Sequence, residues 1–474
     1  MAFTSCLARL RTAEPVVFLY AFGMLIHSPL IQQYVYDRVS EDKGYENNVD
    51  SRTQCANDSD VHDEVESKTS FYMFGLIFSS GVPSLITGLL IGSWSDKVGR
   101  KPAIILPCFG ATIDMSLTLI VIYFDLPLYV LFAGSFLNGM TGYFPAIILA
   151  TMAFIADTTP ESMRAARLGI LEFFVFIGGT IGQAVSGKII ESEGGYKVPY
   201  WIVCSCMIGA TLYAIFLMPE TLPKANRDKS AKFFDKKHFN AVMDVVRNQP
   251  ERKGNLRWLI ALNYFLHISY FGSYTVTILF LLDKPLCWSP LDIGLYSAER
   301  FFCLGIGAVI GVKFLSKCFK TMNIIYFGLL TYITSLILFA FADTAALVCS
   351  VPVVGMFIGA VIAFFRSMMS QQASREEQGS LFAAIGFVDV LATVTASAIF
   401  NLLYPLSLKF DFNGTSFLVA ALLGLVVLYF TTRLSGSLAA TSANVIDESL
   451  EKPVDEETPL LISDTHSTYS ETKT

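Results

Sequence analysis

Ionisable side chains interrupt long apolar stretches of this 474-residue sequence, where each one carries an energetic cost of about 3 kcal/mol. The four of interest are Glu172 in RLGILEFF, His27 in LIHSPL, His267 in FLHISYF and Asp389 in GFVDVL. Exclusion of water shifts the pKa of a carboxyl group upward, and imidazole titrates near pH ~6.5. These residues are therefore candidates for taking up and releasing a proton.

Ordinary structural roles are the alternative for each candidate. Glu172 lies near the end of its stretch, where it could pair with Arg167 or Arg164. His27 and His267 could each be a neutral side chain that is hydrogen-bonded within a helical bundle. The sequence leaves these alternatives open.

Two arginines also stand within apolar stretches, Arg366 in AFFRSMM and Arg300 in SAERFF. A fixed cation in a cavity attracts carboxylates, and a guanidinium group can hold one through two hydrogen bonds. Glu299 precedes Arg300, but neighbouring residues on a helix point about 100° apart and are not expected to pair. We predict that one of two acids in apolar stretches, Asp114 or Asp389, pairs with Arg300 or Arg366. A charge that only sets membrane topology is the alternative for Arg366.

The elements that must position these residues are membrane-spanning helices. The chain is 53% hydrophobic and 16% charged, whereas a soluble protein has about 25% charged residues. A span takes about 20 apolar residues and must be helical, because lipid offers no partner to an unpaired backbone group. The predicted spans are 15–36, 70–92, 103–124, 128–155, 168–190, 200–218, 258–282, 292–316, 323–342, 346–368, 379–403 and 416–432. The predicted class is an all-α, polytopic membrane protein with twelve transmembrane helices in two six-helix halves.

Loop charge predicts the orientation, because cytosolic loops are enriched in Lys and Arg. Loop 219–257 has ten Lys and Arg against five acids, and loop 37–69 has ten acids against four Lys and Arg. We therefore expect 219–257 and both termini in the cytosol. The glycosylation sequons at Asn57 and Asn413 fall on the opposite side, in agreement with this orientation.

Cys55 and Cys287 are the cysteines that fall in the predicted non-cytosolic loops. An oxidising compartment permits a disulfide there, so we predict that the two residues pair and join the halves. The alternative is two free thiols.

The predicted organisation follows from the spans. It comprises a cytosolic N-terminus (1–14), a first bundle (15–218, with outer loop 37–69), a cytosolic central loop (219–257), a second bundle (258–432) and a disordered cytosolic tail (433–474). In the tail, Glu456 precedes Leu460 and Leu461 in EETPLL. This acidic dileucine pattern is typical of an endosome–lysosome sorting signal that clathrin adaptors bind.

The charged stretch GSWSDKVGRKP, residues 92–102, separates the second and third spans. Gly99 allows a tight turn, and Asp96 can accept hydrogen bonds from Arg100 or from the first amides of a neighbouring helix. We predict that Asp96, Gly99 and Arg100 form a conformational latch between the halves. A solvated, positively charged turn is the alternative.

The pattern G-x-x-x-D-x-x-G-R-[RK] in this stretch resembles the signature loop of the major facilitator superfamily. The stretches EPVVFL (14–19), IQQYVYDR (31–38), KPLCW (284–288), EEQGSLFA (376–383) and TASAIFNLLYP (395–405) resemble solute carrier family 46. The resemblance implies the major facilitator fold, proton-driven symport of organic anions, and a disulfide between the first and fourth outer loops.

The resemblance also implies roles for single residues. Glu172 matches a proton-coupling glutamate of the family, and Arg366 matches an arginine linked to substrate and proton handling. Tyr270 and Tyr143 stand where the family's folate transporters have a functional histidine and aspartate. These two replacements disfavour folate as the substrate.

The expected function is proton-coupled symport of an organic anion (folate-like, steroid-conjugate or wall-fragment class) from an acidic lumen or exterior into the cytosol. The alternatives are a non-transporting receptor or sensor on the same scaffold, and a plasma-membrane folate importer. The expected partners are the anion, protons, the lipid bilayer and a clathrin adaptor. The sequence shows no enzyme motif, basic nucleic-acid element or metal motif, so we expect no enzyme, no nucleic-acid partner, and no cofactor except the proton gradient. The lysosomal membrane is favoured as the location over the plasma membrane.

Overall fold

The computed structural model describes residues 12–44, 59–159, 161–193, 195–228, 233, 250–372, 378–410 and 412–451. Residues Met1–Thr431 form one compact unit and Thr432–Thr474 form a second. Most of the described residues are helical, and no β-strand occurs among them.

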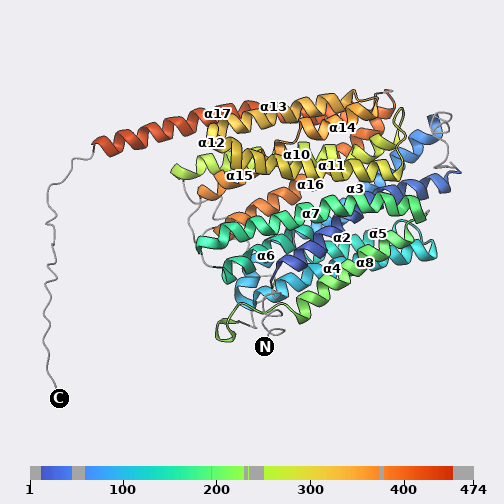
Figure 1. The fold of residues 1–474 in the computed structure, drawn as a ribbon, viewed down its shortest axis with the longest axis horizontal. Coiled ribbons are helices and arrows are strands. Elements are labelled where there is room, and N and C mark those ends of the chain that lie inside the picture. The colour runs from blue at the N-terminus through green and yellow to red at the C-terminus, as the bar shows by residue number, and fades with distance from the viewer. Residues whose placement is uncertain are drawn as a thin grey trace, which may run out of the picture. The chain divides into compact units, whose positions relative to one another are not determined.

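Twelve helical segments of the described chain are long and apolar enough to cross a membrane, which confirms the predicted number and fold class (Figure 1). The helices of the first half are α2 (Glu14–Asp42), α3 (Ser59–Val98), α4 (Arg100–Phe124), α5 (Val130–Met140), α6 (Tyr143–Thr158), α7 (Glu161–Glu193) and α8 (Lys197–Phe216). After the 3-10 turn η1 (Lys224–Asn226), the second half comprises α10 (Pro250–Leu282), α11 (Pro290–Val309), the π-helical turn η2 (Ile310–Leu315), α12 (Ser316–Cys318), α13 (Thr321–Ala340), α14 (Ala345–Val354), α15 (Ile358–Gln371), α16 (Gln378–Leu408) and α17 (Thr415–Glu451).

Several helices extend beyond the apolar spans that the sequence predicts. Helices α2 and α3 leave only residues 43–58 between them, although residues 37–69 were expected to form a loop. Helix α10 begins at Pro250, within the predicted central loop, and α17 continues to Glu451, within the predicted tail. Hydropathy marks the part of a helix that can lie in lipid, but backbone hydrogen bonding can continue past that part.

The fourth and tenth spans are each broken into two helices, although each was expected to be one. Gly142, with φ +101°, and Tyr143, with φ +57°, separate α5 from α6. The chain from Gly355 to Phe357 separates α14 from α15. The two spans occupy corresponding positions in a repeat of six plus six, where interrupted helices are typical of transporter binding sites.

The two halves contact one another at the end of the bundle where α2 ends and α3 begins, which we call the outer end, following the predicted orientation. Gln32 Nε2 on α2 donates a hydrogen bond to the carbonyl oxygen of Thr275 on α10, at 3.1 Å. Helices α7 and α11 approach so closely that a Cβ atom on Gly294 would lie 2.8 Å from Gly187 Cα. Side chains larger than glycine would therefore separate the halves here.

Candidate functional site

Asp389 on α16 is the acid around which the predicted proton-handling residues of the second half gather. Its Oδ1 accepts a hydrogen bond from Asn263 Nδ2 at 2.7 Å and lies 3.5 Å from His267 Nε2, both on α10. Its Oδ2 lies 3.2 Å from Arg366 NH2 on α15. The pairing that the sequence left open is thus between Asp389 and Arg366. Three helices of one half hold the cluster, which we call the Asp389 centre.

Both ring nitrogens of His267 face acceptor oxygens. Nδ1 of His267 lies 2.9 Å from the carbonyl oxygen of Asn263, and a carbonyl oxygen only accepts hydrogen bonds, so Nδ1 carries a hydrogen. A neutral imidazole has only one N–H, which would leave the lone pair of Nε2 facing a carboxylate oxygen. A hydrogen on Nε2 would bridge the 3.5 Å to Asp389 Oδ1. The two side chains are thus close enough to share a hydrogen bond.

Glu172, on α7 of the first half, also interacts with this centre. Its carboxylate and the guanidinium group of Arg366 attract one another through space. The alternative partner Arg167 instead bonds to Glu14 on α2, with NH2 2.7 Å from Oε1. Arg366 is thus a cation attracted to carboxylates of both halves.

Arg300 on α11 lies among aromatic and hydroxyl groups of α10. Its guanidinium carbon is 5.4 Å from the ring centroid of Tyr270 and 5.1 Å from that of Tyr274. Its NH1 donates a hydrogen bond to Thr277 Oγ1 at 3.1 Å. No carboxylate in the described part of the chain forms an ion pair with Arg300. A partly buried cation with neutral neighbours favours binding of an anion.

First-half residues complete the surroundings of Arg300. Tyr143, at the break between α5 and α6, lies near Tyr274. Ser28 Oγ on α2 lies 2.9 Å from the Tyr274 hydroxyl. Tyr143, Tyr270 and Arg300, which the sequence nominated separately, therefore belong to one region between the halves.

The structure gives other nominated residues different neighbours. His27 Nδ1 lies 3.2 Å from the Tyr200 hydroxyl on α8, within the first half. Glu299 is hydrogen-bonded to Cys349 and not to its neighbour Arg300. Asp114 accepts a hydrogen bond from Asn138 Nδ2 at 2.9 Å, so it does not serve as the arginine partner.

Comparisons with known proteins show the family to which the chain belongs. The model of the Major Facilitator Superfamily matches residues 14–397. The proton-coupled folate transporter of Rattus norvegicus is 31% identical over 420 residues, which cover 86% of this chain and 88% of that protein. The lysosomal proton-coupled steroid conjugate and bile acid symporter of Gallus gallus is 30% identical over 432 residues, covering 88% and 92%. The chain belongs to solute carrier family 46 of the major facilitator superfamily.

Solved structures confirm the facilitator fold. The D-xylose-proton symporter superposes with a TM-score of 0.64 at 16% identity, covering 91% of this chain and 97% of that one. The human organic anion transporter MFSD10 gives 0.63 at 15% identity, covering 89% and 99%. Members of the superfamily carry solutes across membranes, so this facilitator is a transporter and not an enzyme.

The signature loop of this facilitator ties helices of the first half together. Arg100 bonds to Asp96 Oδ1 at 2.5 Å and to Asp157 Oδ2 on α6 at 2.8 Å. The first amides of α4, at Arg100 and Lys101, donate to the carboxylate of Glu220 at 2.9 and 3.2 Å. The expectation that Asp96 accepts from Arg100 therefore holds, whereas Glu220 binds the helix amides. In this structure these bonds join the loop to neighbouring segments of the first half and to Glu220, and the latch between the halves stays a prediction.

Gly99 should resist substitution because its φ is +128° and a Cβ atom would lie 2.2 Å from Glu220 Oε2. We expect Gly99→Ala to lower stability by about 1–3 kcal/mol, measured as a drop in the thermal unfolding midpoint of the purified protein. Gly88→Ala is the matched control, because a Cβ atom there meets nothing within 4 Å. Equal midpoints for the two variants would contradict the assignment.

Sequence reasoning missed Asn263, Glu220 and Asp157, because a neutral residue, or an acid in a loop or at the end of a helix, carries no signal until its partner is known. Cys287 is disulfide-bonded, and the other described cysteines are free. The predicted partner Cys55 lies outside the described residues, so the pairing stays a prediction.

The amide nitrogen of Asn413, the atom to which a glycan would attach, donates a hydrogen bond to Asp283. Further nominated residues outside the described part are Asn57, Glu456, Leu460 and Leu461.

Proposed function

We propose that this facilitator is a proton-coupled symporter that carries organic anions into the cytosol. The observation that carries the proposal is the contact between His267 and Asp389, two ionisable side chains 3.5 Å apart in apolar helices, which are placed to share a proton. The names of two relatives support it, since one is a proton-coupled folate transporter and the other a proton-coupled steroid conjugate and bile acid symporter.

Arg366 links the proton to the movement of the halves in this proposal. While Asp389 is ionised, it competes with Glu172 of the opposite half for the same guanidinium group. A proton on the Asp389 centre weakens the attraction between Asp389 and Arg366. The attraction between Glu172 and Arg366 then becomes the stronger of the two. Proton binding thereby changes the balance between two arrangements of the halves, as alternating access requires.

Arg300 is the proposed anion site. The guanidinium can grip a carboxylate or sulfate through two hydrogen bonds, and the rings of Tyr270 and Tyr274 supply flat surfaces for an apolar body. This combination suits a large, amphipathic organic anion. Tyrosines at 143 and 270 disfavour folate, and we place the substrate nearer to the steroid-conjugate class.

Uptake measured at two outside pH values tests the function. Cells that carry the facilitator at their surface should accumulate a labelled steroid sulfate faster from an acidic medium than from a neutral one. Collapse of the pH difference with a protonophore should remove the gain. If the cells bind such anions but do not accumulate them at either pH, the facilitator is instead the non-transporting receptor or sensor that the sequence left as an alternative.

The sorting pattern in the tail gives a separate prediction. If Leu460 and Leu461 direct the chain to lysosomes through a clathrin adaptor, their joint replacement by Ala should move most of the protein to the cell surface. Surface biotinylation measures the change, with Leu450→Ala as the control outside the pattern. Unchanged lysosomal staining would exclude this signal.

A further inference from the structure

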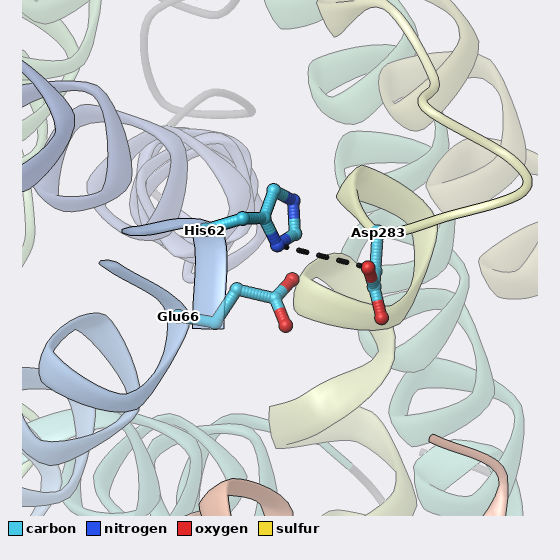
Figure 2. Close-up of side chains that lie close together, drawn as sticks. All are labelled: His62, Glu66 and Asp283. Atoms are coloured by element: carbon cyan, nitrogen blue, oxygen red, sulfur yellow. Dashed lines mark ion pairs between the residues drawn. The ribbon is translucent and has the colours of Figure 1, made fainter. Parts of the chain in front are cut away.

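Three buried side chains outside the transport site converge where the halves meet at the outer end. His62 and Glu66 lie one turn apart on α3 of the first half, and Asp283 directly follows α10 of the second half. They are 2%, 0% and 4% exposed. Figure 2 shows the three side chains pointing toward one another. One ligand atom of each lies within 4.8 Å of the other two, and His62 Nδ1 is 3.7 Å from Asp283 Oδ1.

Glu66 is the member of the cluster whose hydrogen bonding is incomplete. Its Oε1 is buried and has no hydrogen-bond partner, although the side chain is directed into the cluster (Figure 2). A buried carboxylate oxygen without a partner is costly, and a second carboxylate beside it adds repulsion. A cation among the three side chains would remove these costs.

A second layer of polar groups already holds each of the three side chains in place. The Tyr36 hydroxyl on α2 lies 3.4 Å from His62 Nε2, a contact that orients the ring with Nδ1 toward Asp283. The Tyr404 hydroxyl on α16 donates to Glu66 Oε2 at 3.3 Å, and Asn413 donates to Asp283 Oδ2. Such outer partners orient ligands in metal sites and fix the histidine tautomer.

We propose that His62, Glu66 and Asp283 form a Zn²⁺ site that spans the two halves of the transporter. Imidazole and carboxylate are a usual donor set for zinc, with water in the remaining position. Ligand atoms at ~2.1 Å from zinc lie about 3.4 Å apart in a tetrahedral arrangement, so the observed 3.7 Å separation of His62 Nδ1 and Asp283 Oδ1 needs only a small adjustment.

The placement of the site gives the metal an effect on transport. Two ligands belong to the first half and one to the second, so the complete donor set exists only while the outer end is closed. A ligand that binds one conformation shifts the population toward it. Zn²⁺ on the outer side should therefore hold the outer end shut and slow uptake.

Direct binding tests the site independently of the proposed function. Full-length protein, purified through a tag without histidine, is dialysed against micromolar Zn²⁺, and its metal content is measured by mass spectrometry. We expect close to one retained ion in the wild-type protein and a higher thermal midpoint with zinc. Glu66→Gln and His62→Ala should weaken the affinity at least about tenfold. Glu64→Gln, on an exposed face of the same helix, is the matched control and should bind like wild type.

Uptake gives the second readout. External Zn²⁺ should inhibit the wild type and Glu64→Gln but not Glu66→Gln, whose amide is close in shape to the carboxylate it replaces. Zinc retention that is the same in the wild type and in Glu66→Gln would overturn the site. Because binding is measured on purified protein, a failure of proton-driven uptake would overturn the proposed function and leave the metal site standing.

Discussion

Asp389→Asn should abolish proton-driven accumulation of substrate. Asparagine keeps the size of the side chain and one of the two oxygens, which can accept from Asn263 or from Arg366 but not from both, and it neither carries a negative charge nor takes up a proton. One coupled proton that moves down a gradient of about two pH units supports up to about 100-fold accumulation. The variant should lose this accumulation, and the rate of uptake should no longer rise in acidic medium.

Exchange of labelled for unlabelled substrate separates coupling from transport. Exchange needs no net proton movement, so Asp389→Asn should retain it, which would show that the variant folds and binds. Asp114→Asn is the matched control, since Asp114 is also a buried acid but bonds to Asn138 within the first half. Full accumulation by Asp389→Asn, or its loss in both variants alike, would contradict the role of the Asp389 centre.

Much of the architecture could be predicted because the bilayer imposes it on composition. The twelve spans follow from runs of apolar residues, and the structure confirms their number. The breaks in the fourth and tenth spans could not be read from hydropathy, because a broken helix is as apolar as a continuous one. The signal lies instead in two glycines. A positive φ costs little at Gly142, and Gly355 is the residue at which α14 ends.

The candidate site shows where a single sequence stops being informative. His267, Asp389 and Arg366 each stood out alone, because a charge in an apolar stretch is conspicuous. Their grouping depended on how three helices pack, and the sequence placed Asp389 equally well beside Arg300. The metal cluster was missed for a different reason: His62 and Glu66 lie in a stretch expected to be a loop, where acids are ordinary. Their burial became apparent only once α3 was seen to extend to Ser59.

The second large effect is expected from replacement of Arg300, which should lower the affinity for the substrate. A charge-assisted hydrogen bond contributes about 1.5–3 kcal/mol, so Arg300→Ala should raise the KM for an organic anion roughly 10- to 150-fold. The proton-coupled character of the remaining uptake should persist, because the Asp389 centre bonds to Asn263, His267 and Arg366 and not to Arg300.

Comparison with lysine separates charge from geometry. Arg300→Lys keeps the charge but loses the planar pair of donors, so we expect a KM between those of wild type and Arg300→Ala. Arg38→Gln is the matched control: Arg38 already has acid partners in Glu41 and Asp125, and its removal should leave the KM nearly unchanged. Uptake rates over a range of anion concentrations, corrected for surface abundance, give the values. If Arg300→Ala lowered kcat and left the KM at the wild-type value, Arg300 would act in the movement of the halves, and the anion would bind elsewhere.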